Sequence, residues 1–206
     1  MYSDLTIIDY GHGNIGSLIN MIKKAGYSCN VASTIYDIEN ANRLILPGVG
    51  SFDSGIKSLN NQKYLDVLFD KIKIKKTPIL GICLGMQLFF EGSDEGLLKG
   101  LALIEGRCEK FIFGTDSIFK VPNMGWLEID FKKDNEMTRN FDTHPRFYFA
   151  HSYHGVCKNQ ADILAIANYG YDFLAALESE NIIGVQFHPE KSHKFGMKVF
   201  SNFMKL

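Results

Sequence analysis

The order of apolar and polar residues divides the chain into two halves. In the first half, short apolar runs alternate with longer amphipathic stretches, as in strands separated by helices. Such alternation indicates right-handed βαβ crossovers and a parallel sheet that helices cover on both faces. The expected strands lie near Leu5 to Asp9, Ser28 to Ala32, Arg43 to Leu46 and Pro78 to Ile82, and the expected helices near Asn14 to Gly26, up to about Lys73, and along LGMQLFFEG after Cys83.

In the second half, apolar runs follow one another through short polar turns. They are CEKFIF, GWLEIDF, RFYFAHSY, DILAIANY, FLAALES and IIGVQFH, and a last helix is expected over about His193 to Lys205. Short runs of this kind predict antiparallel strands added to the parallel sheet. A chain of 206 residues supports one sizeable core. We therefore predict one domain, 1–206, of the α/β class, with a mixed, mostly parallel central sheet flanked by helices and extended by antiparallel strands.

Composition and charge exclude several classes of partner. With 22 Lys and Arg against 23 Asp and Glu, the formal net charge is -1, which gives no indication of nucleic-acid binding. The basic run Lys71 to Lys76 falls where a helix should end and is interpreted as a solvated helix end. No apolar run reaches the ~18 to 20 residues of a membrane span, and the first strand begins too early for a signal peptide. The four cysteines are widely spaced, so we expect reduced thiols, no metal site and a cytoplasmic location.

GHGNIG, between the first strand and the first helix, fits the dinucleotide-binding pattern G-x-G-x-x-G through Gly11, Gly13 and Gly16. A dinucleotide site also needs an acidic residue near the end of the second strand to hold the ribose. SCNVAST offers none before Asp37, so the nucleotide interpretation is set aside.

GICLGMQLFF has the form of a nucleophile elbow, with Cys83 in place of the serine. The tight turn between strand and helix needs small flanking residues, here Gly81 and Gly85, and it projects the side chain over the sheet edge. The helix N-terminus favours a thiolate. A cysteine taken alone is more often a core residue, but the elbow context makes Cys83 a candidate nucleophile.

VQFHPEKS supplies a candidate base, His188, at the end of another apolar strand, and Glu190 is placed to orient its imidazole. The amide of Leu84 is the first oxyanion donor that elbow geometry provides. LPGVGSF supplies a second candidate, since the glycines on either side of Val49 let a peptide plane turn toward a reacting carbonyl. Each feature alone also fits an ordinary structural residue or turn.

PGVGSF, GICLGMQLFFEGSDE and GVQFHPEKS, in this order, resemble the class I glutamine amidotransferases. IIDYGHGNIGSL, PNMGWLEI and FYFAHSYH resemble one branch, the glutaminase subunits of imidazole glycerol phosphate synthase, over about Thr6 to Phe203. The resemblance implies Cys83 as nucleophile, His188 as general base and acid, and Glu190 as the residue that orients His188. The implied oxyanion groups are Val49, Gly50 and Leu84. The residues that the resemblance implies for glutamine binding are Gly48, Gln87, Glu95, His151, Ser152 and Tyr153. Those that it implies on the side of the partner are Gly11, Asn14, Pro122, Met124, Trp126 and Lys191.

The implied reaction is hydrolysis of L-glutamine to glutamate and ammonia through a thioester, without metal or organic cofactor. Ammonia would pass to a (β/α)8-barrel synthase subunit in a heterodimer, for histidine biosynthesis. Leu127 and His154 depart from the pattern of that branch, on the expected partner side, so a paralogue feeding a sugar-aminating synthase stays an alternative. A non-catalytic protein of the same fold and a cysteine peptidase also stay open, although the intact Cys83, His188 and Glu190 argue against the first.

Overall fold

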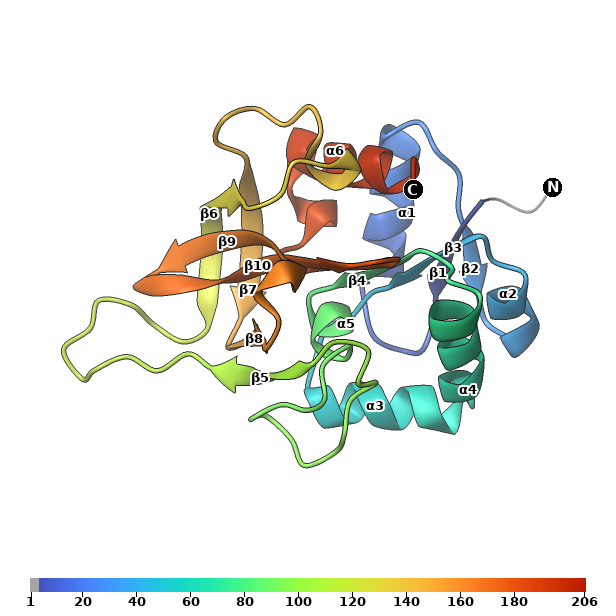
Figure 1. The fold of residues 1–206 in the computed structure, drawn as a ribbon, viewed down its shortest axis with the longest axis horizontal. Helices are drawn as coiled ribbons and strands as arrows, with labels where there is room; N and C mark the ends of the chain where they lie inside the picture. Colours follow the sequence, from blue (N-terminus) through green and yellow to red (C-terminus); the bar gives the residue numbers. More distant parts are fainter. Residues whose placement is uncertain (1–3) are drawn as a thin grey trace.

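The computed structural model describes residues 4–206 and is built on one nine-stranded sheet (Figure 1). In space the strands follow the order β2, β1, β3, β4, β11, β10, β9, β6, β7. Their bounds are β1 Leu5–Ile8, β2 Asn30–Ala32, β3 Arg43–Leu46, β4 Ile79–Ile82, β6 Asn123–Phe131, β7 Arg146–His151, β9 Ile163–Tyr169, β10 Tyr171–Ser179 and β11 Ile182–Val185.

Helices cover both faces of the parallel half of this sheet (Figure 1). Helices α1 (Ile15–Lys24) and α6 (His193–Phe203) lie on one face, and α3 (Phe52–Asn61), α4 (Tyr64–Phe69) and α5 (Leu84–Gln87) on the other. Helix α2 (Ile35–Glu39) lies beside β2. Short helical turns complete the chain at Asp70–Ile74, Glu136–Thr138, Gln160–Asp162 and Pro189–Lys191.

The direction of the strands brings distant parts of the sequence to one edge. Strands β2, β1, β3, β4 and β11 pair with one another in parallel, and β10, β9, β6 and β7 continue the sheet from β11 with antiparallel pairing. The segments that follow β1, β3, β4 and β11 therefore leave the sheet at the same edge. In open parallel sheets this edge is where ligands bind, and it carries Gly11, Gly48, Cys83 and His188.

The predicted fold class is confirmed, and three details of the prediction are wrong. Strand β11 is parallel to β4 and antiparallel only to β10, because its fully buried residues place it in the middle of the sheet. Strands β5 (Gly106–Lys110) and β8 (Tyr153–Cys157) form a separate two-stranded sheet. The helix after Cys83 ends at Gln87, since residues 101–104 return along the chain and donate backbone hydrogen bonds to the carbonyls of residues 88–90.

Lys71 also differs from its prediction as part of a solvated helix end. Its side chain is buried, and its ammonium donates to the carbonyl of Glu39 at 3.1 Å and of Ala41 at 2.6 Å. These carbonyls lie at the C-terminal end of α2, where cations are favoured. Burial, followed by the nearby charge of Lys75, lowers the pKa of Lys71. Lys71 therefore ties α2 to the end of the α4 segment.

No helix among residues 4–206 is long and apolar enough to cross a membrane.

We expect Lys71→Met to lower the free energy of unfolding by about 2 kcal/mol, because two carbonyls lose their buried donor. Urea unfolding followed by circular dichroism measures the difference. The matched control is Lys75→Met, whose ammonium pairs with Asp70 in solvent and should change little. Equal effects of the two substitutions would contradict the structural role assigned to Lys71.

Candidate active site

Cys83 lies between β4 and α5 in a strained turn, with φ of 53° and ψ of -109°. A positive φ is costly for a residue with a side chain and persists only where the surroundings impose it. Gly85 is part of those surroundings, because a Cβ there would lie 1.8 Å from the carbonyl oxygen of Leu46. A Cβ on Gly81 would lie 2.5 Å from the ring of Phe89. The elbow that the motif predicts is therefore present, and its glycines are required by close packing.

His188 reaches this elbow from the end of β11. Its Nδ1–H donates to the Glu190 carboxylate at 2.8 Å, and its ring lines the same cavity as Cys83. Burial by itself would lower the pKa of His188, but the bonds to Cys83 and Glu190 outweigh it and raise the pKa well above its ordinary value. The other carboxylate oxygen of Glu190 is buried without a hydrogen-bond partner among the described residues. The ion pair with His188 therefore offsets the cost of burying the Glu190 carboxylate.

A pair of buried glutamines supports the elbow, and the motif analysis missed one of them. Gln186 is fully buried, and its side-chain amide donates to the sulfur of Cys83 at 3.6 Å. Gln87 donates to the Gln186 side-chain oxygen at 3.1 Å and to the carbonyl of Tyr153 at 2.9 Å. Gln186 stands two residues before His188, so VQFHPE contains the only local signal that could have identified it.

The segment between β3 and α3 runs beside the elbow. Gly48 packs against it so closely that a Cβ would lie 2.7 Å from Cβ of Leu84, which gives this glycine a packing role behind the strand. Val49 and Gly50 line the same cavity as Cys83. Among residues 4–206, neither of their amides donates to another backbone group. Both amides are therefore free to receive a developing negative charge.

One cavity of about 270 Å³ collects most of the residues that the motifs single out. Its size suits a molecule no larger than an amino acid, below the range of drug-sized pockets. Gly48 and Glu190 lie outside its lining, Glu190 because it sits behind His188. The lining consists of Val49, Gly50, Cys83, Leu84, Gln87, Glu95, Pro122, Ala150, His151, Ser152, Tyr153, His188 and Lys191.

His151 contributes a neutral ring to this cavity. Its Nδ1–H donates to the carbonyl of Tyr153 at 2.9 Å, and its Nε2 accepts from the amide of Asn123 at 3.2 Å. Both bonds suit the neutral tautomer, because an accepting Nε2 carries no proton. Burial, and then the charges of His154 and His188, lower the pKa of His151 to about 3 against the opposing bond to Tyr153.

Glu95 joins the cavity to the start of α3. Its carboxylate accepts from the backbone amide of Phe52 at 2.8 Å, and Asp53 in return accepts from the amides of Leu97 and Leu98. A carboxylate at a helix N-terminus satisfies a free amide and is favoured by the helix dipole. The loop that carries Glu95 is thereby fastened to the segment that follows Val49 and Gly50.

The residues expected on the partner side divide into two groups. Met124 and Trp126 are exposed on one face of β6, and the Trp126 ring stacks on His193 with centroids 5.5 Å apart. Pro122 and Lys191 line the cavity, and the Lys191 ammonium lies 5.4 Å from the ring centroid of Tyr148.

The other two expected residues follow β1. Asn14 caps α1 by accepting from the amide of Ser17, and the amide of Gly11 donates to Asp9. His154, a departure from the family pattern, is buried in an aromatic cluster with its ring 4.7 Å from that of Phe111.

This arrangement holds the parts that acyl transfer requires. A thiol lies at a strained elbow, a histidine that hydrogen-bonds an orienting carboxylate lines the same cavity, and so do two residues whose amides have no backbone partner among the described residues. No group of three or more His, Cys, Asp or Glu side chains within residues 4–206 is arranged to hold a metal ion.

Comparison with known proteins places the chain among enzymes of this kind. The family model described as "Glutamine amidotransferase class-I" matches residues 6–206. Imidazole glycerol phosphate synthase subunit HisH 2 of Methanococcus maripaludis is 47% identical over 201 residues, which cover 98% of each chain. The HisH subunit of Leptospira borgpetersenii is 44% identical, with 97% of this chain and 98% of the other covered.

The fold also matches solved structures whose sequences are distant. A crystal structure described as a glutamine amidotransferase superposes with a TM-score of 0.74 at 14% identity, covering 97% of each chain. PurLQS from Thermotoga maritima superposes with a TM-score of 0.69 at 19% identity, covering 100% of this chain and 99% of the other. At such low identity these likenesses concern the fold alone.

We expect the two cavity histidines to respond to pH in opposite ways. His151 should stay neutral at about pH 5, below the ordinary histidine pKa, because its own pKa is lowered. His188 should keep its charge at about pH 8, because its pKa is raised. Glu190→Gln should move the His188 titration to lower pH, since the charged ring loses a negative partner. Ring ¹³C shifts in histidine-labelled protein measure this, and a neutral His188 at about pH 8 would contradict the assignment.

Proposed function

The chain belongs to the class I glutamine amidotransferase family, and from this we propose that it is the glutaminase subunit of an imidazole glycerol phosphate synthase in histidine biosynthesis. The observation that carries the proposal is the convergence of Cys83, His188 and Glu190 beside a cavity of amino-acid size. Near-complete coverage of relatives named as that subunit supports the pathway. The substrate is then L-glutamine, and the products are glutamate and ammonia.

The proposed reaction proceeds in two steps. The Cys83 thiolate attacks the side-chain carbonyl carbon of glutamine, and the amides of Leu84 and of the Val49–Gly50 segment stabilise the oxyanion. The charged ring of His188 gives its proton to the departing nitrogen, which leaves as ammonia and yields a thioester. The neutral ring then takes a proton from water, which attacks the thioester and releases glutamate.

The remaining cavity residues would hold the substrate. We assign Gln87, Glu95, His151, Ser152 and Tyr153 to glutamine binding, supported by the place of each in the cavity lining. Gly48 supports this wall by packing against the elbow and touches no substrate in our proposal. A neutral His151 suits this role, because it leaves His188 as the charged ring that serves the leaving group.

The proposed partner is a (β/α)8-barrel synthase subunit that receives the ammonia in a heterodimer. The exposed Met124 and Trp126 follow Pro122, which lines the cavity, along the chain, and this supports a docking surface on that side. Gly11 and Asn14 leave the same sheet edge after β1 and would lie at the border of this surface. We further propose that residues 1–206 act as one domain and that the enzyme works in the cytoplasm, as the biosynthetic pathway implies.

We expect Cys83→Ala to lower glutamate release from L-glutamine by about a thousandfold or more, because no other group supplies the nucleophile. The assay compares the purified subunit alone and with a candidate barrel subunit and that subunit's ligand. Cys29→Ala is the matched control, because Cys29 is a half-buried thiol outside the cavity. Cys83-independent turnover would reject the mechanism, and turnover that ignores the barrel subunit would favour a sugar-aminating partner.

Assembly with the barrel subunit tests the docking surface. We expect Met124→Lys and Trp126→Ala each to weaken the heterodimer about tenfold or more, as loss of a buried apolar or aromatic anchor does. Tyr36→Lys is the control, since Tyr36 is equally exposed but lies on α2 at the far edge of the sheet. Sedimentation velocity gives the dissociation constants, and equal weakening by all three substitutions would place the interface elsewhere.

A further inference from the structure

Gln186 contacts the sulfur of Cys83 from the end of β11. Its side-chain nitrogen donates to Sγ of Cys83 at 3.6 Å, and the backbone amide of Cys83 donates to the carbonyl of Val185 at 2.8 Å. Gln186 is fully buried, and its own backbone amide donates to the carbonyl of Ala175 at 2.9 Å. The residue is therefore fixed at both backbone and side chain, and its side-chain amide stays at the thiol.

A chain of hydrogen bonds decides which end of the Gln186 side-chain amide faces the sulfur. The chain starts at the carbonyl of Tyr153, which can only accept, so the nitrogen of the Gln87 side chain must face it, at 2.9 Å. The same nitrogen lies 3.1 Å from the Gln186 amide group and requires an acceptor there, so the oxygen of Gln186 faces Gln87. The nitrogen of Gln186 is thereby left for Cys83. A backbone carbonyl thus sets the orientation of both amides.

A donor at this position distinguishes the two forms of a cysteine. A thiolate accepts a hydrogen bond strongly because the acceptor is charged, whereas the sulfur of a neutral thiol is a weak acceptor. Hydrogen bonds to the charged form of a group favour that form. Gln186 carries no charge of its own. Its amide therefore stabilises a thiolate without adding a titratable group to the cavity.

The donor is in place at both stages of the proposed reaction where sulfur is charged. Before attack on glutamine, Cys83 is a thiolate. In the second step water forms a bond to the thioester carbon, the carbon–sulfur bond breaks, and its electron pair returns to sulfur while His188 holds the proton from water. The nitrogen of Gln186 then faces a sulfur that regains its negative charge.

We propose that Gln186 is a further catalytic residue, whose side-chain amide holds the Cys83 sulfur and stabilises its thiolate before attack and again when the thioester is hydrolysed. The inference rests on the proposed glutaminase function. Gln87 and the carbonyl of Tyr153 are positioning groups, because they direct the nitrogen of Gln186 toward the sulfur. VQFHPE then supplies a donor to the nucleophile as well as the base and its orienting carboxylate.

The first test is alkylation of Cys83 by iodoacetamide, in which the sulfur displaces iodide and no glutamine is needed. Gln186→Met replaces the amide by a flexible apolar side chain that has no donor. At about pH 6 we expect alkylation to slow about tenfold, because loss of a hydrogen bond to a charged group leaves less of the thiol ionised. Mass spectrometry of the peptide that contains Cys83 separates its reaction from that of the other cysteines.

The same variant should behave differently in alkali. At about pH 9.5 alkylation of Cys83 in Gln186→Met should equal or exceed the wild-type rate, because a less stabilised thiolate is intrinsically more nucleophilic. A merely structural role would not produce rates that fall at one pH and recover at the other. Gln87→Met should give a smaller fall at about pH 6, because the Gln186 amide remains but is free to turn its oxygen toward the sulfur.

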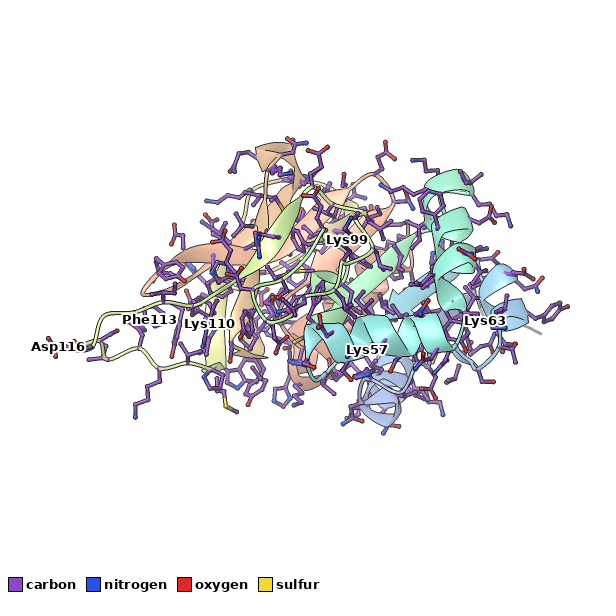
Figure 2. The ribbon with its side chains drawn as sticks, turned by 90° about the horizontal axis from the view of Figure 1, so that it is seen from below. Lys57, Lys63, Lys99, Lys110, Phe113 and Asp116 are labelled. Carbon is purple, nitrogen blue, oxygen red and sulfur yellow. The ribbon has the colours of Figure 1, made fainter. Side chains whose placement is uncertain are left out.

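Two controls separate this effect from general damage. Asn202→Leu removes another buried side-chain amide, which donates to two backbone carbonyls from α6 and lies outside the cavity. Lys57→Ala changes an exposed side chain on α3, also outside the cavity (Figure 2). Both variants should alkylate at wild-type rates at either pH.

Two outcomes would overturn the proposal. One is a Gln186→Met rate that is lower by the same factor at both pH values, which would indicate a distorted cavity. The other is a Gln186→Met profile that superposes on that of the wild type. Circular dichroism checks that the variant folds. If it does not fold, Gln87→Met decides the matter, and an unchanged profile for that variant would reject the relay to Cys83.

Glutaminase kinetics separate this inference from the proposed function. With the barrel subunit present if the wild type needs it, Gln186→Met should lower kcat/KM for L-glutamine about tenfold near pH 6 and less at higher pH. A wild type that releases no glutamate but shows the expected alkylation rates would reject the proposed function and support the donor at the thiol. Unchanged kcat/KM in Gln186→Met near pH 6 would overturn the catalytic role of Gln186 while the proposed function stands.

Discussion

The active site depends on how closely the turn after β4 approaches the end of β3. A Cβ on Gly85 would lie 1.8 Å from the carbonyl oxygen of Leu46, and one on Gly48 would lie 2.7 Å from Cβ of Leu84. The two segments can touch only because both positions lack side chains. This contact forces Cys83 into its strained conformation and sets the Val49–Gly50 segment beside the thiol. Larger residues at either glycine would separate Cys83 from the proposed oxyanion donors.

Opposite electrostatic environments within one cavity divide the work between two histidines. His188 faces a buried carboxylate and a thiol, and these raise its pKa against the effect of burial. Among the described residues, the hydrogen-bond partners of His151 are a carbonyl and an amide, so burial prevails and its ring stays neutral. The environments differ because one ring follows the central strand β11 and the other ends the edge strand β7. The fold therefore suits one ring to the proposed proton transfer and leaves the other as a neutral hydrogen-bonding group.

Sequence reasoning succeeded where the signal is local and failed where contacts join distant segments. The elbow residues around Cys83 lie within a few positions of one another, and so do His188 and Glu190, so motif chemistry predicts each of these two local arrangements. The parallel pairing of β11 with β4 and the separate pair of β5 and β8 depend on partners elsewhere in the chain.

Contacts of individual side chains with distant segments were likewise not predicted from the sequence. The burial of Lys71 depends on carbonyls about 30 residues earlier in sequence, and neither hydropathy nor charge patterning reveals such a partner. Gln186 reaches Cys83 across 103 positions. The hydrogen bond between the His12 ring and the Val49 carbonyl joins segments 37 positions apart and became visible only in three dimensions.

The central position of β11 affects when the active site forms during synthesis and folding of the chain. Its register pairs Ile79 with Ile182, so closing this part of the sheet joins residues 103 positions apart. Contacts so remote in sequence carry a large loop-closure cost and tend to form late in folding. A chain emerging from the ribosome holds Cys83 long before β11 and His188 have been synthesised. Cys83, the proposed nucleophile, therefore lacks its proposed base while translation proceeds, and the proposed triad is complete only once β11 has joined the sheet.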